Sequence, residues 1–198
     1  MFKSMFSCVC LVVLLSACSS RGYVHGEYDK NPNETNMLND RWSESDVQNV
    51  VKDLVKSLVQ HRSISVARRP PVLMVTRLHN KTSEHIDTQN ITDMIRVELS
   101  RGGRVQFVDK AARDDVADEY SYQSSGMVSG ETKKGPGGQI SADYIVNGRV
   151  DSIVQQTGNQ KSVYYKVTLN MTNLKTNIIE WTDYKQLRKR YDKQRIGL

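Results

Sequence analysis

The chain has 198 residues, a formal net charge of +6 at pH 7, four histidines and three cysteines. All three cysteines lie within the first 18 residues, so the rest of the chain can form no disulfide framework, no thiolate zinc site and no cysteine nucleophile. The histidines lack the spacing of a metal site, and we interpret them as surface or loop residues; they are His25, His61, His79 and His85.

Residues 1–17 predict a signal peptide. Lys3 supplies a positive charge, and the largely apolar run from Met5 to Leu15 is too short to span a bilayer. The run ends in Leu15-Ser16-Ala17-Cys18, which resembles the bacterial lipobox. That resemblance implies cleavage before Cys18 and lipid attachment to its thiol, and the serines that follow imply sorting to the periplasmic side of the outer membrane. An ordinary signal peptide with a chance cysteine is the alternative.

Residues 18–41 separate the lipidated cysteine from the rest of the chain. They are mostly polar, contain a single proline at Pro32 and show no apolar periodicity, which predicts a flexible linker. Residues 42–198 have the length of one globular domain with its own hydrophobic core.

The first half of this domain is predicted to alternate helices with strands. Ser43 can cap a helix in which valines and leucines recur at helical spacing up to Val59. Residues 72–75 form a short apolar run that is typical of a central strand buried on both faces. A polar loop over 77–87 leads to a helix over about 88–100, with Asp87 or Thr88 as its N-cap. A second strand follows at 105–108.

The second half is predicted to be richer in strands. A polar helix over about 110–122 precedes a glycine- and lysine-rich loop, and residues 140–143 suggest a short helical entry. Alternating side chains then predict antiparallel strands over 144–154, 163–174 and 178–182. The predicted fold class is therefore α/β, a mixed sheet of about five strands with helices packed on it.

No catalytic constellation is evident in the sequence. Glu84, His85 and Asp87 could serve acid–base chemistry in a cleft, but a capped helix entry explains them with fewer assumptions. We expect no cofactor, no metal ion and no small-molecule substrate. Export of the protein also removes nucleic acid as the partner of its basic residues. A binding or regulatory module, and not an enzyme, is the resulting prediction.

Several segments together carry a family resemblance: the lipobox, the helix start at 42–46, the strand at 71–75, residues 80–87, Ala142-Asp143-Tyr144 with Gly148, and residues 178–181. They are similar to the LpoB family, outer-membrane lipoproteins that activate penicillin-binding proteins, over roughly residues 41–190. The resemblance implies a fold like the N-terminal domain of TolB. It also implies a non-catalytic protein that docks on a periplasmic accessory domain of a class A penicillin-binding protein and stimulates peptidoglycan synthesis.

The candidate residues for the partner surface are all charged or titratable. They are Lys81, Glu84, His85, Arg188, Lys189 and Arg190. For the basic run over 185–195, an acidic partner, anionic lipid and a solvated tail remain alternatives. An alternative function is that of a component of an outer-membrane secretion or assembly system that resembles the CsgG lipoproteins. The linker departs from that of the better-known LpoB proteins, which is long and proline-rich.

Overall fold

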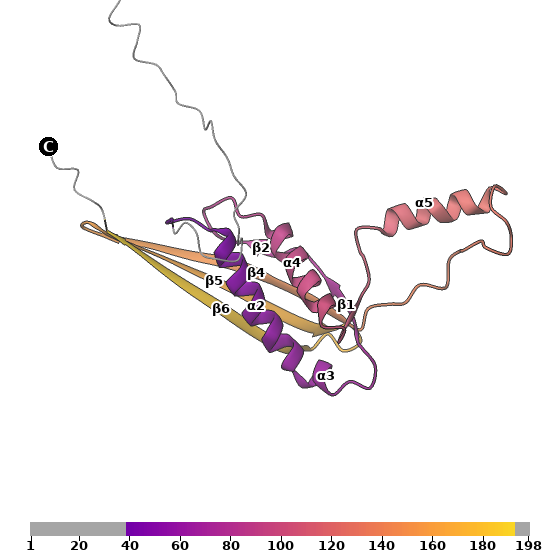
Figure 1. The fold of residues 1–198 in the computed structure, drawn as a ribbon, viewed down its shortest axis with the longest axis horizontal. Helices are drawn as coiled ribbons and strands as arrows, with labels where there is room; N and C mark the ends of the chain where they lie inside the picture. The colour runs from indigo at the N-terminus through magenta and orange to yellow at the C-terminus, as the bar shows by residue number, and fades with distance from the viewer. Residues whose placement is uncertain (1–38, 193–198) are drawn as a thin grey trace, which may run out of the picture. The chain divides into compact units, whose positions relative to one another are not determined.

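The structure is a computed structural model that describes residues 39–192, and a mixed six-stranded sheet lies at the centre of these residues (Figure 1). The predicted α/β class with a mixed sheet is confirmed, with six strands where about five were expected. The predicted signal peptide, Cys18 and linker residues 19–38 lie outside the described residues.

Three short strands and three long strands make up the sheet. The order of the strands is β3-β1-β4-β5-β6, and β2 also pairs with β4. The short strands, which pair in parallel, are β1 (Val72–Val75), β2 (His79–Asn80) and β3 (Gln106–Phe107). The long strands form an antiparallel meander and are β4 (Tyr144–Thr157), β5 (Gln160–Asn173) and β6 (Ile179–Asp192). Strand β2 falls inside the predicted polar loop. The sequence did not predict it, because two residues are too few to show a periodicity.

Four helices accompany the sheet within the described residues: α2 (Glu44–Gln60), α3 (Arg62–Ser65), α4 (Thr88–Arg101) and α5 (Arg113–Ser124). The carboxylate of Asp87 accepts hydrogen bonds from the backbone N–H groups of Gln89 and Asn90, so Asp87 is the N-cap of α4. At the start of α2, Asp46 accepts the backbone N–H of Ser43 at 2.8 Å. No helix within residues 39–192 is long and apolar enough to cross a membrane.

Helices α2 and α4 cover one face of the sheet (Figure 1). The core lies between them, because alternate residues of β5 point toward the helices; Val163, Tyr165, Val167, Leu169 and Met171 are all buried. Within residues 39–192, no helix covers the opposite face in this way. Helix α5 contributes no buried residue and lies apart from the sheet in Figure 1.

Three predictions about the elements need correction. Residues 140–143 are not helical, because the backbone of Asp143 continues the ladder with β1 and its N–H donates to the carbonyl of Val72 at 2.7 Å. Strand β1 is not buried along its whole length, since Met74 and Val75 are half-buried. Strand β6 does not end at Thr182 but runs to Asp192, and it pairs with β5 from Gln160 to Thr172. Most of the C-terminal basic run is therefore strand and not tail.

Candidate functional site

The two sides of β6 have different environments. From Trp181 to Arg190 the side chains alternate between buried or half-buried and exposed. The exposed set faces away from α2 and α4, and it consists of Thr182, Tyr184, Gln186, Arg188 and Arg190. Together with the facing residues of the neighbouring strands, these side chains form a surface that we call the open face. Its further members are Asn147, Arg149, Asp151 and Ile153 of β4, Tyr164, Lys166, Thr168 and Asn170 of β5, and His79 and Lys81.

The open face is hollowed near the middle of the sheet. A cavity of about 550 Å³ lies there, and Lys81, Arg149, Lys166 and Tyr184 are among its lining residues. These residues come from β4, β5, β6 and the loop after β2, so the cavity depends on the register of the whole meander. The sheet therefore brings together basic side chains that are far apart in the sequence.

Positive charge on the open face is left largely unpaired. Arg149 forms an ion pair with Asp151 at 2.9 Å, whereas Lys81, Lys166 and Arg190 form none within residues 39–192. Arg188 lies over the ring of Tyr164, with its guanidinium carbon 5.8 Å from the ring centre. The chemistry of this face suits an acidic surface on another molecule.

Lysines on the covered side have carboxylate partners instead. Lys161 pairs with Asp40 at 2.5 Å, Lys189 pairs with Asp46 at 2.5 Å, and Lys185 pairs with Asp53. The carboxylates come from α2 and from the residues that precede it. The basic residues of β5 and β6 thus fall into two groups. Those on the covered side form ion pairs within the domain, and those on the open face form none within residues 39–192.

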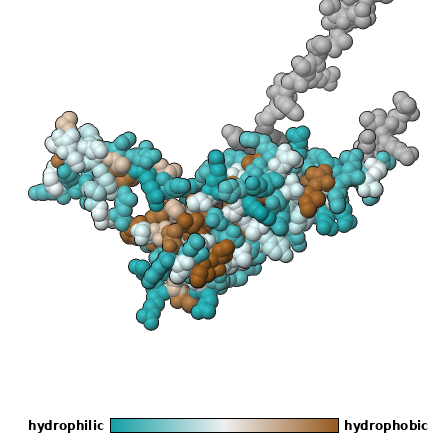
Figure 2. All heavy atoms as spheres, turned by 180° about the vertical axis from the view of Figure 1, so that it is seen from behind, coloured by the Kyte–Doolittle hydropathy of each residue, from teal (hydrophilic) through white to brown (hydrophobic). Residues whose placement is uncertain are grey.

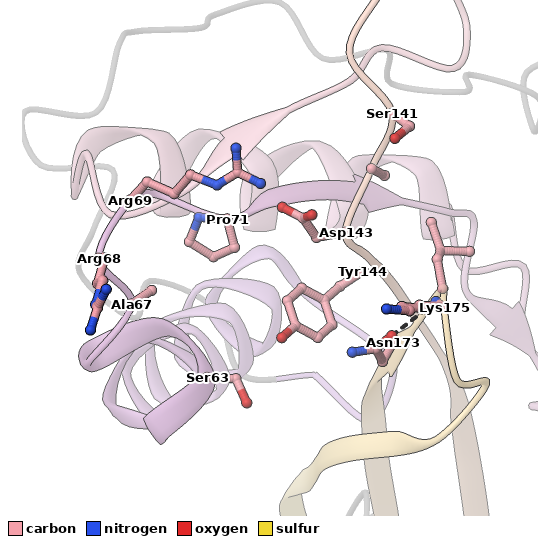
Figure 3. A pocket seen from close by; sticks show the side chains of 12 residues that line it. Ser63, Ala67, Arg68, Arg69, Pro71, Ser141, Asp143, Tyr144, Asn173 and Lys175 are labelled. Carbon is pink, nitrogen blue, oxygen red and sulfur yellow. Dashed lines mark hydrogen bonds between the residues drawn. The ribbon is translucent and has the colours of Figure 1, made fainter.

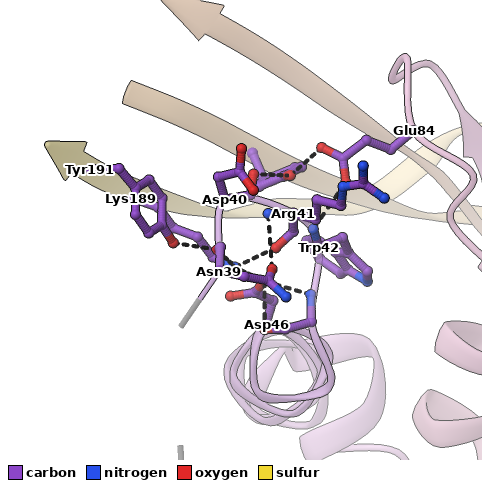
Figure 4. Close-up of polar contacts among 10 residues, drawn as sticks. Asn39, Asp40, Arg41, Trp42, Asp46, Glu84, Lys189 and Tyr191 are labelled. Carbon is purple, nitrogen blue, oxygen red and sulfur yellow. Dashed lines mark hydrogen bonds and ion pairs between the residues drawn. The ribbon is translucent and has the colours of Figure 1, made fainter. Parts of the chain in front are cut away.

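A second cluster joins the start of the domain to β5 and β6 (Figure 4). We call it the N-terminal clasp, and it consists of residues 39–42 with their partners. The ammonium group of Lys189 donates to the carbonyl of Arg41 at 2.7 Å, and the hydroxyl of Tyr191 donates to the carbonyl of Asn39. Residues 39–41, which the sequence assigned to the linker, therefore lie against the sheet.

Glu84 completes the clasp from the loop before α4. One of its carboxylate oxygens accepts the backbone N–H of Trp42 at 3.0 Å, and the other accepts the hydroxyl of Tyr165. The rings of Trp42 and Tyr165 pack edge to face, with 5.3 Å between their centres. Burial, together with the hydrogen bond to Glu84, raises the pKa of Tyr165 above its ordinary value. The hydroxyl consequently remains a neutral donor, which suits a structural contact.

The structure separates the predicted partner residues into two groups. Lys81, Arg188 and Arg190 lie on or beside the open face and are exposed. Glu84 and Lys189 belong to the clasp, and His85 is exposed beside it. Lys189 is only 8% exposed, so its assignment to a surface is wrong, and the reason is its ion pair with Asp46.

Sequence reasoning missed most of the open face, including its charged and aromatic members Arg149, Tyr164, Lys166 and Tyr184. The signal that could have found them is the alternation of β5 continued into β6 beyond Thr182. Residues 39–192 contain no group of three or more His, Cys, Asp or Glu side chains that could hold a metal ion.

The chain is similar to one protein family and to several solved structures. A family model described as peptidoglycan-synthase activator LpoB matches residues 46–187. No curated protein matches the chain. Among solved structures, the LpoB C-terminal domain from Salmonella enterica is similar with a TM-score of 0.45 and 14% identity, over 72% of this chain and 98% of that chain. The LpoB C-terminal domain from Escherichia coli has a TM-score of 0.42 and 13% identity over the same shares. PelC from Paraburkholderia phytofirmans has a TM-score of 0.36 and 16% identity, over 62% of this chain and 74% of that chain.

Proposed function

The chain belongs to the LpoB family of peptidoglycan-synthase activators, and from this premise we propose that it binds and activates a class A penicillin-binding protein. The observation that carries the proposal is the family match, which spans most of the described residues. On this proposal the protein contributes no catalytic group to glycan polymerisation or peptide cross-linking. The alternative, a CsgG-like assembly component, has no comparable support.

The open face is the docking surface in this proposal. Lys166, Arg188 and Arg190 give it positive charge without ion-pair partners in the described residues, and Tyr164 and Tyr184 add aromatic area. Arginine and tyrosine are enriched at protein interfaces, and complementary charge accelerates association and selects the partner. The expected counterpart is therefore an acidic patch on a periplasmic accessory domain of the synthase.

Activation without catalysis requires that binding favour one state of the synthase. If the synthase exchanges between a less active and a more active state, a protein that binds the second more tightly raises its population. A tenfold preference corresponds to a coupling free energy of about 1.4 kcal/mol, which is within the usual range of allosteric effects. The domain needs only a surface that fits the active state.

The proposal includes a lipid anchor at Cys18 on the periplasmic side of the outer membrane. Because residues 39–41 lie against the sheet, about 20 residues remain between the anchor and the clasp. A flexible coil of that length spans roughly 25 Å, and its fully extended limit is about 70 Å. The synthase must therefore present its docking domain within the length of this tether plus the length of the domain itself.

The test uses the full-length chain, purified in detergent and immobilised. Envelope extract is passed over it, any penicillin-binding protein retained is identified, and its glycan-polymerisation rate is measured with and without the chain. We expect a class A enzyme to be retained and its rate to rise several-fold. If no synthase is retained, or if its rate does not change, the activator proposal is wrong.

The docking surface is tested by reversing charge. Lys166→Glu combined with Arg188→Glu should weaken synthase binding at least tenfold. The matched control is Lys133→Glu combined with Lys134→Glu, which makes the same change in net charge in an exposed loop. Equal affinity of the two variants would remove the open face from the proposal and leave the family assignment intact.

A further inference from the structure

One end of the sheet contains a cavity that the proposed function does not use (Figure 3). Its volume is about 650 Å³, which is within the range of sites that accept ligand-sized groups. Ser63 of α3, Tyr144 at the start of β4 and Asn173 at the end of β5 line it. The N-terminal clasp contacts the other end of β5, through Lys161 and Tyr165. The cavity and the clasp therefore lie at opposite ends of this strand.

Hydrogen bonds fix one wall of the cavity. The hydroxyl of Ser63 donates to one carboxylate oxygen of Glu180 at 2.6 Å, and the side-chain amide of Asn173 donates to the other at 2.7 Å. Since both bonds favour the charged form, they hold the pKa of Glu180 below its ordinary value. The side-chain oxygen of Asn173 also accepts the backbone N–H groups of Lys175 and Thr176. The turn between β5 and β6 is thus held by its own contacts, and the cavity is preformed.

The cavity carries an excess of positive charge. Arg68, Arg69 and Lys175 line it, and none of them forms an ion pair within residues 39–192. Asp143 is the only carboxylate among the lining residues, and it accepts the backbone N–H of Val72 at 2.9 Å. Figure 3 shows the side chain of Arg69 extending above Pro71 toward Asp143, with Lys175 across the cavity. Further carboxylates would complement this arrangement.

Large aliphatic side chains are exposed around the same cavity. Leu174 lines it and is 45% exposed, and Ile178, whose carbonyl accepts the N–H of Asn173, is 60% exposed. Val66 and Ile140 are exposed and adjoin lining residues in the sequence. In Figure 2 hydrophobic residues gather at this end of the molecule. An exposed apolar patch rimmed by charged groups is typical of an interaction site.

We propose that this end of the sheet binds a segment of a partner protein in which carboxylates flank a large aliphatic side chain. The aliphatic group would pack on Leu174 and Ile178, and the carboxylates would pair with Arg69 and Lys175. Because arginine can bind a carboxylate through two parallel hydrogen bonds, Arg69 would fix the orientation of the segment. None of the residues that line the cavity belongs to the open face, so the inference does not depend on the surface proposed for the synthase.

The concave shape favours a protein segment over a membrane. A flat anionic membrane could contact the exposed aliphatic rim, but it could not fill a cavity of about 650 Å³ lined by Tyr144 and Asn173. A protruding peptide can place one side chain inside the cavity and its charged neighbours at the rim. The preformed wall lowers the ordering cost of such binding.

The probe is a C-terminally amidated peptide of sequence leucine, aspartate, leucine, glutamate, leucine, with a fluorescent label coupled to its N-terminus through an amide bond. Its anisotropy is measured while full-length chain is added in detergent, with empty micelles as a blank. We expect saturable binding, and at least a tenfold loss for Arg69→Glu combined with Lys175→Glu. Both positions are exposed, and Arg69→Gln with Lys175→Gln should cause a smaller loss in the same direction.

Three controls decide between the outcomes. A peptide with asparagine and glutamine in place of the acidic residues should bind at least tenfold more weakly. The Lys166→Glu, Arg188→Glu chain should bind the peptide normally, which separates this inference from the proposed function. Dihexanoyl phosphatidylglycerol below its micellar concentration should not displace the peptide. Absence of binding, indifference to Arg69 and Lys175, or displacement by the lipid would each overturn the inference, the last in favour of lipid headgroups.

Discussion

Lys189 and Arg188 are neighbours in β6, but their side chains enter opposite environments. Lys189 lies 2.5 Å from Asp46 and is 8% exposed, whereas Arg188 lies over Tyr164 on the open face. Removal of one member of a buried ion pair costs about 3 to 5 kcal/mol, because the other charge is left unpaired, and exposed charges contribute little. We expect Lys189→Ala to lower the free energy of unfolding by about 3 kcal/mol and Arg188→Ala by less than about 0.5 kcal/mol. Urea denaturation measures both, and equal losses would contradict the burial of the pair.

Gly148 illustrates a residue whose role is visible only in three dimensions. A Cβ atom built on it would lie 2.0 Å from the carbonyl oxygen of Thr168, so the paired strand would have to move. Overpacking of this kind costs roughly 1 to 3 kcal/mol, and we expect Gly148→Ala to reach the upper end because the obstacle is backbone. Gly135 has no neighbour within 4 Å of such an atom, and Gly135→Ala should change the unfolding midpoint little. Similar midpoints for the two variants in thermal denaturation would refute the argument.

At the scale of elements, prediction succeeded where the sequence pattern has one cause. The apolar stripe of α2 and the capping aspartate of α4 report only local geometry and core contact, and both helices lie close to the predicted positions. The prediction of β6 failed because two sequence patterns overlap in this segment. Its covered side carries Lys185 and Lys189, whose charges are matched by Asp53 and Asp46 from a distant helix, so the strand resembles a basic tail in sequence. The open face was consequently predicted only in part.

Helices α5 and α4 are expected to contribute differently to the stability of the domain. Helix α5 has no buried residue, whereas α4 buries Ile91, Ile95 and Leu99. Proline inside a helix costs about 3 kcal/mol wherever the helix forms. We expect Ala117→Pro to reduce the helical circular dichroism signal while the cooperative unfolding midpoint stays constant. Val97→Pro, at an exposed position of α4, should lower that midpoint strongly. A large midpoint shift for Ala117→Pro would mean that α5 packs on the domain.

At the scale of the whole molecule, the clasp determines where the chain leaves the domain. Contacts of Asn39, Asp40 and Arg41 with Lys189 and Lys161 hold the start of the domain against the early part of β5 and the late part of β6. The cavity lined by Arg69 and Lys175 lies at the opposite end of β5. The described part of the chain therefore begins at the end of β5 that is opposite the cavity.

The proposed anchor gives the last prediction. Each methylene of a buried acyl chain contributes about 0.8 kcal/mol, so several chains on Cys18 would hold the protein on the membrane effectively permanently. We expect Cys18→Ala to shift the protein from the membrane fraction to the soluble periplasmic fraction, as followed by cell fractionation. Cys10→Ala is the matched control, because Cys10 lies inside the predicted signal peptide, and it should leave the protein on the membrane. Retention of the Cys18→Ala protein, or equal release of both variants, would show that another feature holds the chain there.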